Sequence, residues 1–216
     1  MHRPFVYASL FAATTSLFAL TANATLIAYT SDALFSAATE GAVTDTFNDL
    51  VFFSTPASPL SRSLGGGSYT ATTNDSSPFF IGGSSFAPAD GTYLSNNSNS
   101  GQPMHIGGIS GGLPNRAIGG YFFGSNVTPL AAFMTVTAHD IDSSTLTHSF
   151  QCNLTAASCF VGFVSTDGIS SLDFSSNTFF GAVDDLTFAN SVPEPASLAL
   201  LGLGLAGLGF SRRKKA

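Results

Sequence analysis

The clearest pattern in the chain is an alternation of apolar and polar residues in its C-terminal half. Residues 134–139 alternate Met, Val and Ala with Thr, Thr and His, which predicts a strand with one buried face. Similar patterns predict strands over 145–151, 159–166, 169–175 and 181–188. Asp167-Gly168, between the third and fourth of these five strands, is a two-residue hairpin signal. We therefore expect residues 134–188 to form a five-stranded antiparallel meander.

The N-terminal half is less regular. Clusters rich in Gly, Ser and Asn at 65–67, 96–101 and 107–112 predict long loops between short strands such as 68–73 and 117–123. Thr30-Ser31 precedes a short helix on which Leu34, Phe35 and Ala38 share a face, and no helix is expected after residue 43. Residues 25–190 are thus predicted to form one all-β domain, an antiparallel β-sandwich of the jelly-roll or Greek-key, lectin-like kind.

Two apolar runs lie outside this body. The first, over 5–20, follows Arg3 and precedes Ala22-Asn23-Ala24, the order of regions in a cleavable secretory signal peptide. We expect residues 1–24 to be this signal, handled by the secretion machinery and removed by signal peptidase after Ala24. A buried N-terminal helix is the alternative, although the run has no amphipathic stripe.

The second apolar run covers 196–210 and is followed by a basic tail, 211–216, that contains Arg212, Arg213, Lys214 and Lys215. As a helix it is about 22 Å long, short of the roughly 30 Å hydrocarbon core of a bilayer. We expect a single, marginal transmembrane helix. The basic cluster keeps this end in the cytoplasm and leaves the body outside.

Pro193-Glu194-Pro195 stands immediately before that run, and the two prolines prevent the helix from extending backwards. This tripeptide, a short Leu/Gly-rich helix and a terminal Arg/Lys cluster, together spanning 191–216, resemble the PEP-CTERM sorting signal of bacterial envelope proteins. The resemblance implies that an exosortase recognises Pro193, Glu194 and Pro195 and removes the tail. It also implies a Gram-negative host with an extracellular polysaccharide or biofilm matrix. A plain tail anchor, the alternative, explains the apolar run but not the tripeptide.

Charge separates the body from its two ends. Only 9% of residues are charged and the net charge is −6. The body, however, holds every acidic residue except Glu194, which makes 12 acidic residues against Arg62 and Arg116 and a net charge of −10. This excludes a general nucleic-acid binder, which needs a basic surface. Loss of the basic tail should leave a mature protein more acidic than the pI of 4.8 for the whole chain.

The two cysteines, Cys152 and Cys159, each continue the alternation of a predicted strand, so both sulfurs should face the same side across a hairpin. In an exported protein such a pair favours a structural disulfide over a redox centre. Closing this short loop should stabilise the fold by about 2 to 3 kcal/mol.

The body offers only weak candidates for chemistry. Residues 108–112 match the Gly-x-Ser-x-Gly pattern around Ser110, with Asp140, Asp142 and His148 in triad order. Leu113-Pro114 does not begin the helix that a nucleophile elbow needs, so we interpret the match as chance. If extended, Asp140 and Asp142 point the same way and predict at most a structural Ca²⁺ site. No other cofactor is expected, and zinc is disfavoured because the histidines have no ligand spacing.

No pair of acids is spaced for glycoside hydrolysis, because Asp184 and Asp185 should face opposite sides of one strand. Tyr69, Tyr93 and Tyr121 could serve as platforms for stacking sugars, but we expect most of them to be ordinary sheet residues. The sequence therefore predicts a non-catalytic protein that passes through the inner membrane and reaches the cell surface or extracellular matrix. The alternative is a carbohydrate-binding module for extracellular polysaccharide, and a surface ester or glycoside hydrolase is a weaker third.

Overall fold

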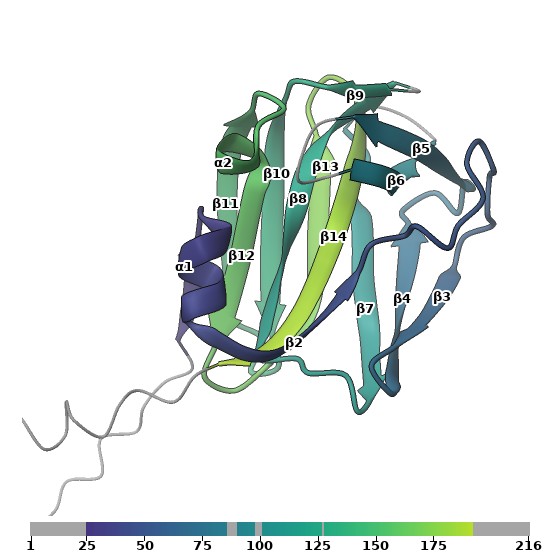
Figure 1. Cartoon of the computed structure of the whole chain (residues 1–216). Coiled ribbons are helices and arrows are strands. Elements are labelled where there is room, and N and C mark those ends of the chain that lie inside the picture. The colour runs from purple at the N-terminus through teal and green to yellow at the C-terminus, as the bar shows by residue number, and fades with distance from the viewer. Residues whose placement is uncertain (1–24, 86–89, 98–100, 127, 192–216) are drawn as a thin grey trace, which may run out of the picture.

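The computed structural model describes residues 25–85, 90–97, 101–126 and 128–191, which form a β-sandwich of two antiparallel sheets (Figure 1). Sheet A contains, in spatial order, β1 (Leu26–Tyr29), β12 (Phe160–Ser165), β8 (Ala117–Asn126), β14 (Phe180–Ser191), β6 (Asp90–Asn96) and β5 (Phe79–Ser85), with β2 (Thr39–Asp45) paired to β14 and β9 (Thr128–Leu130) to β8. Sheet B contains β11 (Thr145–Cys152), β10 (Ala132–Asp140), β13 (Ile169–Ser176), β7 (Met104–Gly111), β4 (Gly67–Thr73) and β3 (Leu60–Leu64). The helices are α1 (Asp32–Ala37) and α2 (Ala156–Cys159).

The all-β prediction is confirmed, and so are most of the strands expected from the alternation. In β10 every second side chain is buried, from Ala132 to Asp140. The weaker N-terminal signals also correspond to strands, namely β4 and the first part of β8.

The predicted five-stranded meander is wrong, because the chain alternates between the sheets instead of staying in one. β10, β11 and β13 belong to sheet B, whereas β12 and β14 belong to sheet A. Asp167-Gly168 is accordingly a corner between sheets and not a hairpin. The backbone N–H groups of Asp167 and Gly168 both donate to the Ser165 hydroxyl, which in turn donates to Asp140 at 2.6 Å. These hydrogen bonds hold the corner in place.

Aromatic side chains fill the space between the sheets. Phe122 of sheet A packs edge-on against Phe174 of sheet B, and Phe188 of sheet A packs against Tyr69 of sheet B, each pair with ring centroids 5.0 Å apart. All four rings are buried. Because each aromatic ring buries a large apolar area, these pairs hold the two sheets face to face.

A second apolar layer covers part of the outer face of sheet A. The buried ring of Phe35 in α1 lies over the paired glycines Gly119 and Gly162, where a Cβ on Gly162 would come within 2.4 Å of the ring. Figure 1 shows α1 lying along this side of the sandwich. The predicted apolar face of this helix is only partly correct, since Leu34 is 62% exposed.

The Cys152–Cys159 disulfide is confirmed. It does not span a hairpin: it closes the connection that leaves β11 in sheet B, forms α2 and enters β12 in sheet A. α2 was not expected from the sequence. It begins at Thr155, whose side chain and that of Ser158 cap each other's backbone N–H groups, an arrangement that offsets the cost of so short a helix.

Arg62, one of the two cations of the body, is tied into the edge of the sandwich. Its guanidinium forms two hydrogen bonds to the buried carboxylate of Asp45 and two to Asp49, at 2.6 to 2.9 Å. The Tyr69 hydroxyl donates to Asp45 at 2.8 Å. The pairing compensates a buried carboxylate and fixes the segment that follows β2 against β3.

Both ends of the described body lie at one end of sheet A. Leu26 pairs with Ser165, while Ala189 pairs with Ala117, which is the partner of Val164. The predicted signal peptide and the sorting segment beyond Ser191 lie outside the described residues. Within those residues, no helix has the length and apolar character to cross a membrane.

Candidate functional site

In the described part of the chain, no other element packs on the outer face of sheet B, and this face carries many hydroxyl groups. Because side chains alternate along each strand, the residues beside each buried one point outward, and most of them are Ser or Thr. We call this surface the hydroxyl face; its Ser and Thr residues are Ser61, Ser63, Ser68, Thr70, Thr72, Ser110, Thr135, Thr137, Thr145, Thr147, Ser149, Ser171 and Ser175. Hydroxyls on adjacent strands bond to each other in the pairs Thr135–Ser149, Thr137–Thr147 and Ser68–Ser110.

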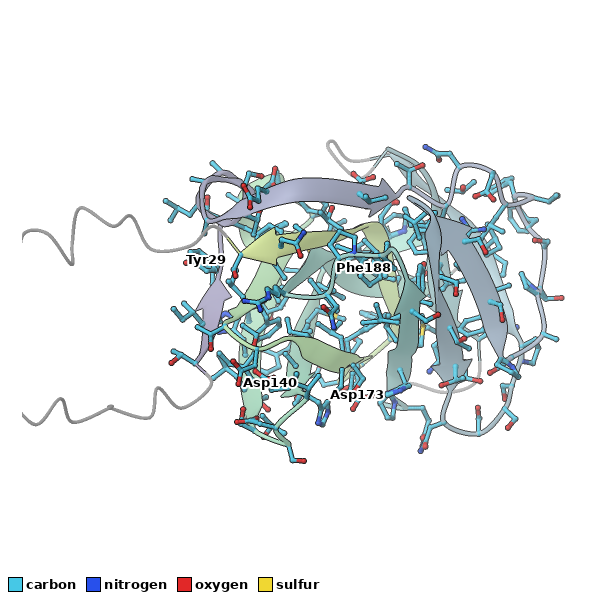
Figure 2. The ribbon with its side chains drawn as sticks, turned by 90° about the horizontal axis from the view of Figure 1, so that it is seen from below. Tyr29, Asp140, Asp173 and Phe188 are labelled. Atoms are coloured by element: carbon cyan, nitrogen blue, oxygen red, sulfur yellow. A yellow bond between two sulfur atoms is a disulfide. The ribbon has the colours of Figure 1, made fainter. Side chains whose placement is uncertain are left out.

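Three ionisable residues from three strands meet near the centre of this face. His105 of β7 donates from Nδ1 to one carboxylate oxygen of Asp173 in β13 at 2.8 Å, and His139 of β10 donates from Nε2 to the other at 2.7 Å. The three side chains are between 35% and 46% exposed. Figure 2 shows Asp173 at the outside of the sandwich, whereas Phe188 lies between the sheets.

The contacts change the proton affinities of this cluster. The hydrogen bond to Asp173 raises the pKa of His105 despite partial burial. Partial burial acts to raise the pKa of Asp173, but the hydrogen bonds and charges of His105 and His139 outweigh it and lower that pKa. Asp173 is therefore an ionised acceptor over a wide pH range, with both oxygens oriented by histidine.

A groove of about 520 Å³ runs beside the cluster and is lined by Thr72, Thr73, Asn74, Pro103, His105 and Asp173. The Asn74 amide at its rim is hydrogen bonded to Gln102. The groove thus combines hydroxyl, amide, imidazole and carboxylate groups, which can all hydrogen bond to a polar ligand.

A glycine makes room for the central histidine. A Cβ on Gly107 would lie 2.5 Å from Nε2 of His105, so the imidazole ring occupies space that any other residue at 107 would fill. Gly107 therefore sets the position of His105 on the hydroxyl face.

One aromatic ring lies on the same face. Phe133 of β10 is 42% exposed and has the same alternation as Thr135, Thr137 and His139. It is six residues from His139, or about 20 Å along the strand. The outward position of Phe133 can be predicted from the sequence, because the alternation that places Thr135 outward also places Phe133 outward.

The three candidate tyrosines are ordinary sheet residues and not sugar platforms. Tyr69, Tyr93 and Tyr121 are buried, since the even spacing that suggested strands also directs their rings into packed layers. Tyr93 donates to or accepts from Ser125 at 2.6 Å, and Tyr121 packs against Phe160. None of the three presents a ring on which a sugar could stack.

The structure separates the two carboxylates proposed for Ca²⁺. Asp140 points inward and is buried, where it accepts hydrogen bonds from Ser165 and from the N–H of Ile141. Asp142 is exposed and accepts from the N–H of Ser144, and this hydrogen bond lowers its pKa. In the described part of the chain, no group of three or more His, Cys, Asp or Glu side chains is arranged so that it could hold a metal ion. A calcium site at Asp140 and Asp142 stays a prediction.

Ser110, the centre of the Gly-x-Ser-x-Gly pattern, lies near the end of β7 and hydrogen bonds to Ser68. His148 pairs with Val136 on β10 and so faces the other side of sheet B, stacked on Phe150. β7 continues into a turn and then β8, without an intervening helix. Ser110 and His148 are therefore not arranged as the serine and histidine of a Ser-His-Asp triad.

Asp184 and Asp185 lie at a bulge of β14, in sheet A. Asp184 is buried and Asp185 has a positive φ of 50°. Burial, and then the charges of Asp32 and Asp185, raise the pKa of the nearby Tyr121. The two carboxylates do not flank a common bond, as a glycosidase would require.

Comparison with known proteins identifies the end of the chain. Residues 191–214 match the PEP-CTERM protein-sorting motif. No curated protein matches the chain. Among solved structures, the CBM22-1 and GH10 modules of endo-1,4-β-D-xylanase 10B from Clostridium thermocellum, complexed with xylohexaose, match 67% of this chain and 27% of that chain, with 12% identity and a TM-score of 0.29. This chain thus spans about a quarter of that structure, and such a TM-score is too low to relate their functions.

Proposed function

We propose that this protein, whose residues 191–214 carry a PEP-CTERM sorting motif, is a non-catalytic envelope or matrix protein processed by an exosortase. The motif match is the observation that carries the proposal. It includes Pro193-Glu194-Pro195, the apolar run 196–210 and the basic residues from Arg212 to Lys214, in the required order. The last strand, β14, ends at Ser191, so one residue, Val192, separates the folded body from the tripeptide.

The proposed route begins with export by the secretion machinery and removal of residues 1–24 by signal peptidase. The run 196–210 then holds the protein briefly in the inner membrane of a Gram-negative cell while the body folds outside. The confirmed Cys152–Cys159 disulfide supports this side of the membrane, because such bonds form and persist in oxidising compartments. Exosortase processing removes the basic tail and releases the body to the cell surface or extracellular matrix.

A second candidate function belongs to the body: binding of extracellular polysaccharide. The observation that favours it is the hydroxyl face, an exposed surface with hydrogen-bonding groups on every strand and a groove beside His105 and Asp173. A surface hydrolase is less well supported, because Ser110 and His148 lie on opposite sides of sheet B.

The sorting proposal is tested by replacing Pro193, Glu194 and Pro195 with alanine in the native host. The intact mass of the variant should still include the C-terminal tail, and the variant should remain in the membrane fraction. The wild type should lack the tail and should leave the membrane fraction. Glu40→Ala is the matched control, since Glu40 is the other glutamate of the chain and is exposed. Unchanged mass and location of the triple variant would refute processing at this motif.

A further inference from the structure

We propose that the hydroxyl face binds an uncharged polysaccharide, with Asp173 as the central hydrogen-bond acceptor and His105 and His139 as the residues that orient it. This inference rests on the second candidate function above and assigns it a site and a ligand class.

The outer faces of the two sheets differ in how far other elements cover them. The outer face of sheet A carries α1 and an aromatic layer of Phe35, Phe160 and Tyr121. Both β8 and β12 are buried along almost their whole length. Among the residues that the structure describes, nothing covers sheet B in this way: β10, β11 and β4 alternate between buried and accessible residues. The accessible half of sheet B is therefore the surface that can meet a long ligand.

The groups on this face suit a polyol. Hydroxyls of Ser and Thr donate and accept, as sugar hydroxyls do. They repeat about every 4.8 Å from strand to strand and about every 6.7 Å along a strand. A polysaccharide repeats the same groups along its length, so several weak contacts can form together on an array of this kind.

Asp173 is the strongest acceptor in the array. Each of its oxygens accepts one histidine N–H, which leaves lone pairs on both oxygens for further donors. Hydrogen bonds to an ionised acceptor are worth about twice those between neutral groups. The two histidines lie on β10 and β7, the strands on either side of β13, and they fix the orientation of the carboxylate before a ligand binds. This preorganisation lowers the entropic cost of binding.

Phe133 adds an apolar contact at the other end of β10. Sugar rings have apolar faces as well as hydroxyl edges, and an exposed aromatic ring can pack against such a face. Between Phe133 and His139 the outward residues of β10 are Thr135 and Thr137. This strand therefore presents an aromatic ring, two hydroxyls and the His-Asp-His cluster in one line.

The charge of the molecule selects an uncharged glycan. Asp173 is the one formally charged side chain among the outward residues of the six strands of sheet B. The body as a whole has a net charge of −10, from its 12 acidic residues and two arginines. An acidic polysaccharide would be repelled by this field, and the face has no acidic cluster that would attract a cationic one.

The test uses the full-length chain in detergent micelles and an array of neutral and acidic oligosaccharides. The strongest neutral binder is then titrated against three proteins: wild type, Asp173→Asn and Asp142→Asn. Asp142 is the matched control, an exposed carboxylate in the turn after β10. Asp173→Asn should weaken binding by about tenfold or more, the loss expected for hydrogen bonds to an ionised acceptor. Asp142→Asn should bind like the wild type.

Histidine ring signals in NMR spectra locate the ligand independently of affinity. His105 and His139 should shift during the titration, whereas His148, on the other side of sheet B, should not. If Asp173→Asn fails to fold, Gly107→Ala replaces it, because its methyl displaces His105 without removing a polar group, and binding should again weaken.

The possible results distinguish an error in the binding site or ligand class from an error in polysaccharide binding itself. Binding of a neutral glycan that is insensitive to Asp173→Asn or Gly107→Ala, or that moves the His148 signal instead, would overturn the site and leave polysaccharide binding intact. Preference for acidic glycans would overturn the ligand class. Binding of no glycan would overturn both this inference and the second candidate function, while the sorting proposal would still stand on its own experiment.

Discussion

The two sheets of this sandwich differ in how many of their faces are buried. In sheet A, β8 and β12 are buried on both faces, and Phe35 of α1 lies directly on Gly119 and Gly162. In sheet B only the inner face is buried, and the outer one carries hydroxyls, Phe133 and the His105–Asp173–His139 cluster. One sheet is thus a packed support, and the other presents the surface that is available for binding.

The largest effect should come from uncovering sheet A. Phe35→Ala removes a buried ring from its outer face and should lower the free energy of unfolding by about 3 to 5 kcal/mol. Leu34→Ala, in the same helix but 62% exposed, should change it by less than about 0.5 kcal/mol. Urea unfolding measures both. Equal costs for the two variants would mean that α1 does not cover the sheet as described.

A smaller effect is expected from filling the space under that ring. Gly162→Ala places a methyl within 2.4 Å of the Phe35 ring, and such overpacking costs about 1 to 3 kcal/mol. The double variant with Phe35→Ala should show coupling, because the clash disappears once the ring is gone. Additive costs in a double-mutant cycle would contradict the contact.

On sheet B, pH should have a modest effect through the central cluster. The raised pKa of His105 means that its contribution to stability is complete below its ordinary value of 6.5 and is lost as pH rises through the raised value. The lowered pKa of Asp173 means that its contribution is present above 3.8 and is lost as pH falls through the lowered value.

The pair should therefore stabilise the fold most between about pH 4 and pH 6.5. Thermal melts of the wild type and Asp173→Asn should differ most in this window and converge toward pH 9. Because both side chains are about a third or more exposed, the effect should stay below about 1 kcal/mol. A difference that grows at alkaline pH would contradict the cluster.

The smallest effect should be seen on the hydroxyl face itself. Thr137→Val removes an outward hydroxyl that hydrogen bonds to Thr147 and keeps the β-branched shape. Stability should change by less than about 0.5 kcal/mol. The reverse exchange on the outer face of sheet A, Val164→Thr, buries a hydroxyl and should cost about 1 kcal/mol or more. Similar costs for the two exchanges would remove the distinction between the sheets.

The sequence predicted sheet B better than sheet A, for a physical reason. A strand with one buried face alternates apolar and polar residues, so the pattern of 134–139 predicts a strand. β8 is buried on both faces and contains Gly119, Gly120 and Gly124, so it carries no alternation and its sequence predicts only the first part of the strand. Alternation also does not say to which sheet a strand belongs, and for this reason the predicted meander was wrong at Asp167-Gly168.

The candidate sites also differ in whether the sequence predicts them, according to how far apart their residues lie along the chain. The Cys152–Cys159 disulfide was predictable because its partners are seven residues apart. His105 and Asp173 are 68 residues apart and meet only through the pairing of β7 with β13, which local patterns do not specify. The sorting motif at 191–214 is a linear signal, so it could be identified without any structure.

The most direct test of export and sorting is the intact mass of the wild-type protein recovered from the cell surface of its host. We expect a chain that begins at Thr25, contains no free thiol and lacks the basic tail from Arg212 to Lys215. A surface protein whose mass still includes Met1 or that tail would contradict it.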